Sequence, residues 1–239
     1  NPDKVEFTFY DGKGDQATQN DSIDTLLQKD VDLLLVNLVD TGAAPTVIDK
    51  IKTAEKPVVL FNREPSADSI KAYDKAIFVG TNAKEAGVMQ GEILSKVWEK
   101  DKTAIDKNGD GVLQYVMLKG EPDNPEAVAR TQYSVSTLND KGVKTEELAL
   151  QVCNWDQALA QNATEAWFSK FGDKIEAVIA NNDGMAQGAI AALQAQGYNN
   201  GDAAKTIPVV GVDATAAAQD LIGKGFMLGS VLQDAEGMA

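Results

Sequence analysis

Short apolar runs alternate with longer amphipathic segments along almost the whole chain, and this alternation restricts its fold more than any other feature. The runs have the length of buried strands, and the segments between them repeat apolar positions with the period of a helix. Strands separated by helices are typical of βαβ units, whose strands lie parallel in a sheet covered by helices. The alternation therefore predicts an α/β protein.

The pattern also gives approximate positions for each element. The predicted strands are residues 5–10, 32–38, 57–62, 76–80, 114–118, 145–150, 176–180, 207–212 and 227–232. The predicted helices are residues 22–28, 43–54, 83–100, 125–138, 155–171, 184–196 and 214–223.

Composition excludes several classes of function. The chain has 239 residues and a net charge of −14, which argues against nucleic acid and anionic lipid as partners, because both favour clustered Lys and Arg. It has no histidine, which removes imidazole bases and the zinc sites that need a His ligand. Cys153 is the single cysteine, so no intrachain disulfide is possible, and we expect a buried thiol. No apolar run approaches a membrane span, and no segment resembles a signal peptide.

Oxygen-bearing side chains occupy every second position early in the run DKNGDGVLQ (106–114), at the spacing of a calcium-binding loop. Gly111 permits the sharp turn of such a loop. The twelfth position, where these loops carry a bidentate carboxylate, is Met117 in a predicted strand, so the last ligand must come from elsewhere in the chain. A polar turn that binds no metal is the alternative. The candidate ligands are Asp106, Asn108, Asp110, the Val112 carbonyl and Gln114.

Polar residues directly follow several predicted strands, at the sheet edge where ligands of α/β proteins gather. Each could instead cap a helix or form a turn. Planar amides and carboxylates pair well with neighbouring hydroxyls, and an aromatic ring suits the CH face of a pyranose. These residues are Asn62, Asn181, Asn182, Asp183, Trp155, Asp213 and Gln233.

A second group of candidates lies on the predicted helix that begins after Asn124. Glu126 and Arg130 stand four residues apart and therefore share one helix face, with Arg130 adding a cationic fork. A surface ion pair is the alternative for these two, and a core position is the alternative for Trp155.

The segments that carry these residues resemble the bacterial periplasmic galactose/glucose-binding proteins, receptors of sugar ABC transporters. The resemblance implies two doubly wound parallel-sheet lobes joined by a hinge, with a partial N-terminal lobe at 1–81, a C-terminal lobe with a calcium loop at 82–232, and the start of a return segment at 233–239. It also implies that the sequence is incomplete at both ends. The segments are QNDSIDTLL, NLVD, PVVLFNREPS, YDKAIFVGTNAKEAG, DKNGDGVLQYVMLKGEP, LNDKGVKTE, IEAVIANNDGMA, IPVVGVDA and GSVLQDA.

The resemblance also assigns residues. It places the distant calcium ligand at Glu176, beside the five loop ligands. It places sugar contacts at Asn62, Arg130, Trp155, Asn182 and Asp213. Three further contact positions depart from the family, which has histidine at Asn124, aspartate at Glu126 and asparagine at Gln233, so the preferred sugar is left open.

The function implied by the resemblance is that of a non-enzymatic, monomeric receptor that closes around glucose or galactose. It would deliver the sugar to the permease of an ABC transporter, with a chemoreceptor as a further partner and calcium as a structural ion. We expect a periplasmic protein, or an exported and lipid-anchored one, with no insertion into the membrane. The alternatives are the sensing domain of a sugar-responsive repressor, which needs a basic helix-turn-helix, and a glycoside-processing enzyme using Asp183, Asp213 or Glu126.

Overall fold

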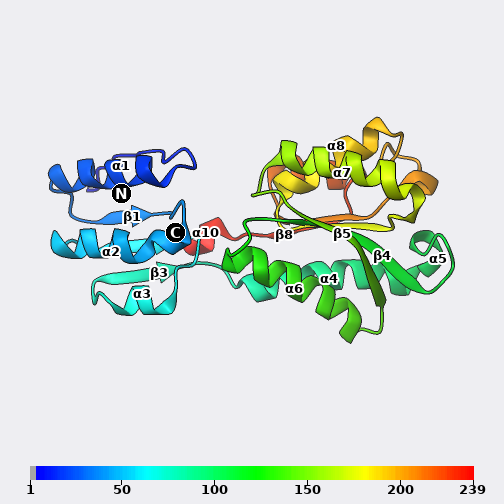
Figure 1. Cartoon of the computed structure of the whole chain (residues 1–239), viewed down its shortest axis with the longest axis horizontal. Coiled ribbons are helices and arrows are strands. Elements are labelled where there is room, and N and C mark those ends of the chain that lie inside the picture. The colour runs from blue at the N-terminus through cyan, green and yellow to red at the C-terminus, as the bar shows by residue number, and fades with distance from the viewer. Residues whose placement is uncertain (1–3) are drawn as a thin grey trace. The chain divides into compact units, whose positions relative to one another are not determined.

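The computed structural model describes residues 4–239, which form two compact units divided between Thr81 and Asn82. Each unit contains one β-sheet whose neighbouring strands all run parallel (Figure 1). Helices fill most connections between strands, so the predicted α/β class is confirmed. Within residues 4–239, no helix is both long and apolar enough to cross a membrane.

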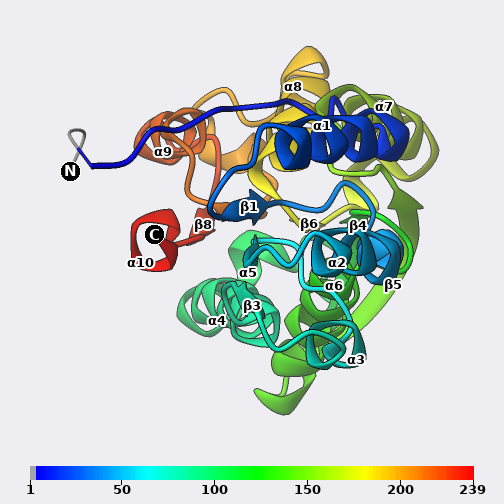
Figure 2. The same ribbon diagram turned by 90° about the vertical axis from the view of Figure 1, so that its left-hand side faces the viewer.

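The first unit is a three-stranded sheet with helices on one side (Figure 2). Its strands, in sheet order, are β1 (Leu34–Val36), β2 (Val58–Phe61) and β3 (Ala76–Val79). Its helices are α1 (Gln16–Gln28), α2 (Ala44–Thr53) and α3 (Ala67–Lys71), with a 3-10 turn at Thr41–Ala43 before α2.

Alternation along the strands decides which face of this sheet is covered. Leu34 and Leu60 are buried against apolar residues of the three helices. Leu35, Phe61 and Ile77 point to the other face and are exposed. The first unit therefore buries only one face of its sheet among the described residues.

The second unit contains a five-stranded sheet of order β5-β4-β6-β7-β8. Its strands are β4 (Val112–Lys119), β5 (Lys144–Val152), β6 (Ala177–Ala180), β7 (Val209–Asp213) and β8 (Gly229–Leu232). Its helices are α4 (Ala83–Lys100), α5 (Lys102–Ile105), α6 (Pro125–Asp140), α7 (Gln157–Phe171), α8 (Asp183–Ala195), α9 (Ala216–Gly223) and α10 (Ala235–Met238), with 3-10 turns at Gly172–Lys174 and Ala203–Lys205.

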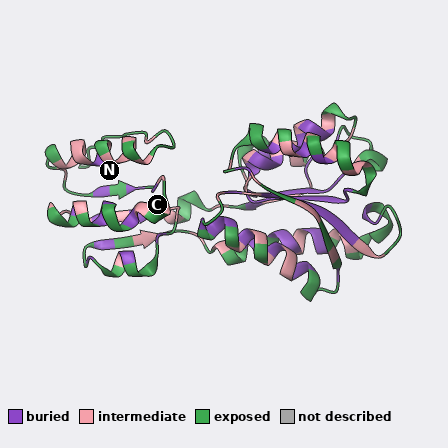
Figure 3. Cartoon of the chain, in the orientation of Figure 1, coloured by how far each residue is buried: buried purple, intermediate pink, exposed green. Residues whose placement is uncertain are grey.

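Helices cover both faces of this second sheet. The pair α4 and α6 packs against one face, around Leu94, Met117 and Leu138, and the pair α7 and α8 packs against the other, around Val116 and Leu193. The central strands are consequently buried along almost their whole length (Figure 3). Strands covered on both sides read as continuous apolar runs, which is why the sequence revealed them.

Helix caps gather polar side chains at the carboxyl edge of this sheet. Asn124, Asp156, Asn182 and Thr215 cap the helices that follow β4, β5, β6 and β7, each by accepting from a backbone N–H of the first turn. The chain leaves every strand at the same edge, so the loops that carry these caps lie together.

One predicted strand is wrong. Residues 5–10 form no strand, and Val5, Phe7 and Phe9 are exposed. Their alternation is that of a strand, but a strand also needs a neighbour for its backbone hydrogen bonds, and none lies beside this segment among the described residues. The helix predicted at 22–28 begins earlier, at Gln16, because Asp15 caps it by accepting from the Thr18 N–H at 2.6 Å.

Candidate functional site

Arg130 is the centre of a polar cluster at the carboxyl edge of the second sheet. It is 4% exposed, and its Nη1 donates to the Asn181 carbonyl at 2.9 Å. Its Nη2 donates to Gln233 Oε1 at 3.3 Å, and its guanidinium carbon lies 5.8 Å from the centre of the Trp155 ring. Side chains from α6, the β5–α7 loop and the segment after β8 therefore meet, and Asn182 joins them by donating from Nδ2 to the Trp155 carbonyl at 3.4 Å.

Trp155 is held by an unusual turn. Asn154 and Trp155 both have left-handed backbones, with φ of 49° and 66°, so the chain reverses before α7 begins. The indole lies on Gly120, where an added Cβ would stand 2.4 Å from its Cζ2 atom. Trp155 therefore begins no helix, contrary to the predicted range 155–171, and the loop sets the position of its ring.

Two buried donors in this cluster have no hydrogen-bond partner among residues 4–239. They are Nε1 of Trp155 and Nε of Arg130. An unpaired donor removed from water costs about 1–3 kcal/mol, so both favour a ligand that brings acceptor oxygens. Hydroxyl groups supply acceptors of this kind.

Asp213 places a carboxylate near Arg130 at the end of β7. Burial raises the pKa of Asp213 to about 6, and the positive charge of Arg130 opposes that rise. Burial also lowers the pKa of Arg130, while Asp213, Glu126 and Asp183 oppose the change. The cluster thus combines one cation with three carboxyl groups.

Asp183 is bonded within the fold, so its oxygens are occupied by protein donors. It is fully buried and accepts from Ser230 Oγ at 2.6 Å, from the Thr215 N–H at 2.8 Å and from Thr215 Oγ1 at 3.2 Å. These bonds join the start of α8 to β8 and α9. Asp183 therefore braces the frame around the cluster.

Asn181 was among the polar residues after strands, but the sequence did not show its bracing role. It is fully buried, and its Oδ1 accepts from the Gly120 N–H at 3.0 Å while its side chain also bonds Thr131 Oγ1 at 3.2 Å. Gly120, Thr131 and Asn181 together link β4, α6 and β6 beneath Arg130. The run Asn181-Asn182-Asp183 signalled polar residues at this edge, and only the fold divides the roles among them.

Asn124 and Glu126 lie at the start of α6. Asn124 Oδ1 caps the helix by accepting from the Glu126 and Ala127 N–H groups, and its Nδ2 donates to Glu121 Oε2 at 3.0 Å. Glu126 is 6% exposed, so it is not the surface ion pair that was the alternative. Asn62 belongs to the first unit, where it follows β2 with a left-handed backbone (φ 65°). A contact of Asn62 with a ligand stays a prediction.

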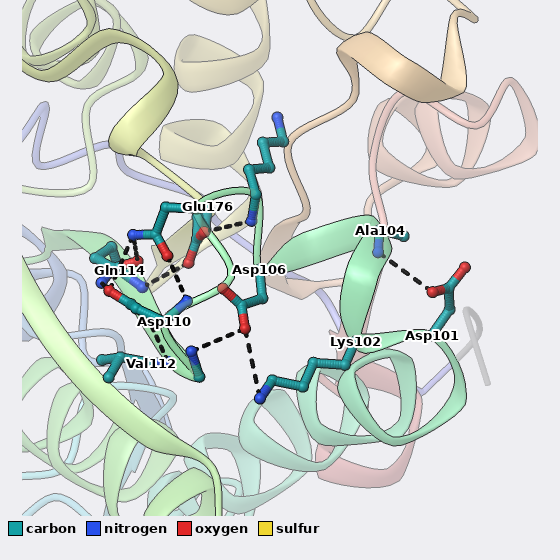
Figure 4. A network of polar contacts seen from close by, with 11 residues as sticks. Asp101, Lys102, Ala104, Asp106, Asp110, Val112, Gln114 and Glu176 are labelled. Carbon is teal, nitrogen blue, oxygen red and sulfur yellow. Dashed lines mark hydrogen bonds and ion pairs between the residues drawn. The ribbon is translucent and has the colours of Figure 1, made fainter.

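The loop between α5 and β4 lies at the opposite, amino edge of the same sheet, and Figure 4 shows its acidic residues with Glu176. Glu176, which is 1% exposed, accepts from the Lys107 N–H at 2.7 Å through Oε1 and from the Gln114 N–H at 3.0 Å through Oε2. It therefore ties the loop to the start of β6. Burial raises the pKa of Glu176, and the charge of Asp106 adds to that rise.

Hydrogen bonds join the polar side chains of the loop to one another and to its backbone. Gln114 Nε2 donates to Asp110 Oδ2 at 2.9 Å, and Asn108 Nδ2 donates to the same oxygen at 3.0 Å and to Gln114 Oε1 at 3.3 Å. Asp106 Oδ2 accepts from the Gly111 N–H at 2.9 Å. The Val112 N–H is held by Asp110 Oδ1 at 2.8 Å.

The residues present fit a hard cation. Asp106 is 7% exposed, and its Oδ1 is buried without a hydrogen-bond partner in the part of the chain that the structure describes. In residues 4–239, no three His, Cys, Asp or Glu side chains form a metal-binding group by themselves. A cation here would therefore depend on amide and carbonyl oxygens as well as carboxylates, which is the donor set that calcium accepts.

The sequence of the chain is similar to those of known periplasmic binding proteins. The model of the periplasmic binding protein domain family matches residues 1–239. The D-galactose/methyl-galactoside binding periplasmic protein MglB of Haemophilus influenzae is 45% identical over 231 residues, which are 96% of this chain and 67% of that protein. A putative rhizopine-binding protein of Rhizobium meliloti is 33% identical over 98% of this chain and 71% of that protein.

The chain also shares its fold with a solved structure. An ABC transporter solute binding protein of Bacillus halodurans with bound myo-inositol superposes with a TM-score of 0.80 at 28% identity, covering 98% of this chain and 74% of that one. Both the sequence match and the shared fold extend over nearly all of the chain. The chain therefore belongs to the periplasmic binding protein domain family.

Proposed function

We propose that this chain is a receptor for a neutral, hydroxyl-rich ring, with a monosaccharide such as glucose or galactose as its ligand. The observation that carries the proposal is the cluster around Arg130. There, Nε of Arg130 and Nε1 of Trp155 are buried without a partner among the described residues, near the Asp213 carboxyl. Hydroxyls of a pyranose would accept from the unpaired donors and donate to Asp213, and its CH face would pack on the indole.

The relatives support this class of ligand. The Haemophilus influenzae relative is named for D-galactose and methyl-galactoside, and the Bacillus halodurans structure holds myo-inositol. Galactose, as a pyranose, and myo-inositol are both six-membered rings with adjacent hydroxyls. The receptor would work in the periplasm and deliver its ligand to the permease of an ABC transporter, with a chemoreceptor as a second partner. We propose that it acts as a monomer.

The receptor would not be an enzyme. A glycosidase needs two carboxyl groups that face the scissile bond. Asp183, one of the candidates, has its oxygens occupied by Ser230 and Thr215, which favours binding over catalysis.

Calcium would be structural in this receptor. Asp106, Asn108, Asp110, Val112, Gln114 and Glu176 would hold it, and its charge would offset the carboxylates of the loop. Oδ1 of Asp106 supports this assignment, because it is buried and has no hydrogen-bond partner within residues 4–239.

Isothermal titration calorimetry of the 239-residue chain with D-galactose, D-glucose and myo-inositol tests the receptor proposal. Binding of at least one ring is expected, with affinity lost in Trp155→Ala. Ser169→Ala, an exposed change on α7, is the control and should bind as the unchanged chain does. Heat signals absent for all three rings, in a protein with an intact circular dichroism spectrum, would refute it.

A further inference from the structure

Lys102 places a cation on the first acidic residue of the loop. Its Nζ lies 3.4 Å from Asp106 Oδ2 (Figure 4). It also lies 5.2 Å from the centre of the Trp98 ring. A Cβ added at Gly111 would stand 3.1 Å from this Nζ. The ammonium therefore lies against the turn of the loop, next to the oxygens assigned to a metal.

The two members of this ion pair differ in their freedom to move. The Asp106 side chain is 4% exposed, whereas the Lys102 side chain is 48% exposed. Asp106 is also fixed by the Gly111 N–H. Lys102 is long and flexible, so it can leave the pair for water at small cost, while Asp106 cannot.

Lys102 carries a positive charge beside a loop that is rich in carboxylates. Three carboxylates, Asp106, Asp110 and Glu176, lie around one short loop and repel one another when no cation is between them. Lys102 thus offsets part of the repulsion from a position at the rim of the loop.

We propose that Lys102 is a tethered counter-ion that competes with the divalent cation for the Asp106 carboxylate and so sets the metal affinity of the loop. The inference rests on the proposed calcium site. A calcium ion lies about 2.3–2.6 Å from its ligand oxygens. A cation bound to Asp106 would therefore repel the ammonium, which leaves for solvent as the metal enters. Binding is then an exchange of one cation for another.

The exchange predicts opposite effects on the two states. Lys102→Met removes the competitor, so calcium should bind about two- to fivefold more tightly, the size expected for a partly exposed ion pair. The metal-free protein should unfold at a lower temperature, because its carboxylates lose their counter-ion, whereas the calcium-loaded protein should unfold at the same temperature as the unchanged chain. A salt bridge of purely structural value would lower both temperatures and leave the affinity unchanged.

Calcium chloride titration by calorimetry, together with thermal unfolding in EGTA and in calcium, tests the inference. Lys102→Gln is a second neutral variant, and Lys102→Arg keeps the charge and should behave as the unchanged chain does. Lys100→Met is the matched control, because it removes an exposed lysine two residues away, in the last turn of α4. The difference between Lys102→Met and the unchanged chain should also shrink as the salt concentration rises.

The outcomes separate the two proposals. Calcium binding by the unchanged chain with equal or weaker binding by both neutral variants would overturn the role of Lys102 alone. No calcium binding by any variant would overturn the metal site and this inference together. Binding by the neutral variants and not by the unchanged chain would support both, with Lys102 as a complete block.

Discussion

Individual residues of the candidate site have a pKa or a fixed side-chain position that they would not have in water. Asp213 is the clearest case, because burial raises its pKa to about 6 beside the cation of Arg130. Trp155 is another, since its left-handed backbone and the absence of a side chain at Gly120 together fix the ring. Both features are measurable through single substitutions.

Ligand affinity should fall as the pH drops through about 6, because protonation of Asp213 removes a charged acceptor for a sugar hydroxyl. Calorimetric titration with the best-binding ring from pH 5 to pH 8 measures this. Asp213→Asn should bind at least about tenfold more weakly at pH 7.5 and should lose the dependence near pH 6. An unchanged pH profile in Asp213→Asn would assign the titration to another group.

The same group affects stability in the opposite direction. The folded pKa of Asp213 lies above its unfolded value of 3.8, so the folded protein binds the proton more tightly. The stability that this carboxyl contributes is fully present below pH 3.8 and is lost as the pH rises through about 6. Acid therefore weakens ligand binding while this residue, taken alone, stabilises the fold.

Gly120→Ala should weaken ligand binding with little loss of secondary structure. The new Cβ would stand 2.4 Å from Cζ2 of Trp155, so the indole must move away from its position beside Arg130. Gly223→Ala is the matched control, because a Cβ there meets nothing within 4 Å and Gly223 has no left-handed backbone. Quenching of tryptophan fluorescence by acrylamide and ligand calorimetry follow the two variants. Equal affinities would show that the ring position is not critical.

At the scale of the element, the sequence predicted most strands and helices because their patterns are local. The helix predicted at 83–100 is α4 with the same bounds, since Asn82 caps its start. Residues 5–10 carry an equally clear alternation and form no strand, because strand formation depends on a neighbour elsewhere in the chain. The left-handed turn at Trp155 also depends on a distant residue, Gly120, and no local pattern announces it.

The candidate site was predictable to the same extent. Asn182, Asp213 and Gln233 follow strands in the sequence, so their place at the carboxyl edge could be foreseen. The contacts that each side chain makes there could not be foreseen. The side-chain oxygens of Asn124 and Asn182 accept from backbone N–H groups in the first turns of their helices. This role depends on the exact residue at which each helix begins.

The proposed calcium site, which Glu176 links to the start of β6, predicts a measurable stabilisation by calcium. Calcium at 100 times its dissociation constant should stabilise the protein by about 2.7 kcal/mol, and so raise the midpoint of unfolding by about 5–10 °C. Glu176→Gln should abolish this shift, because it removes a buried carboxylate while keeping one acceptor for the Lys107 or Gln114 N–H. Differential scanning fluorimetry in EGTA and in calcium compares the two. A shift retained in Glu176→Gln would exclude this residue as a ligand.

At the scale of the whole molecule, the two units differ in how completely they bury their sheets. The second unit covers both faces with helices and contains two large apolar clusters. The first unit covers one face and leaves Leu35, Phe61 and Ile77 exposed, as well as Phe7 and Phe9 before α1. Because apolar burial is the main favourable term in folding, the first unit should be the less stable one.

Calorimetric unfolding should therefore show two transitions, with the first unit unfolding at the lower temperature. Calcium should raise only the upper transition, since all the candidate ligands lie in the second unit. Hydrogen exchange followed by mass spectrometry identifies the units, and backbone amides of β2 should exchange faster than those of β6. A single transition that calcium shifts as a whole would mean that the units unfold together, and the coupling between them would then outweigh the difference in their cores.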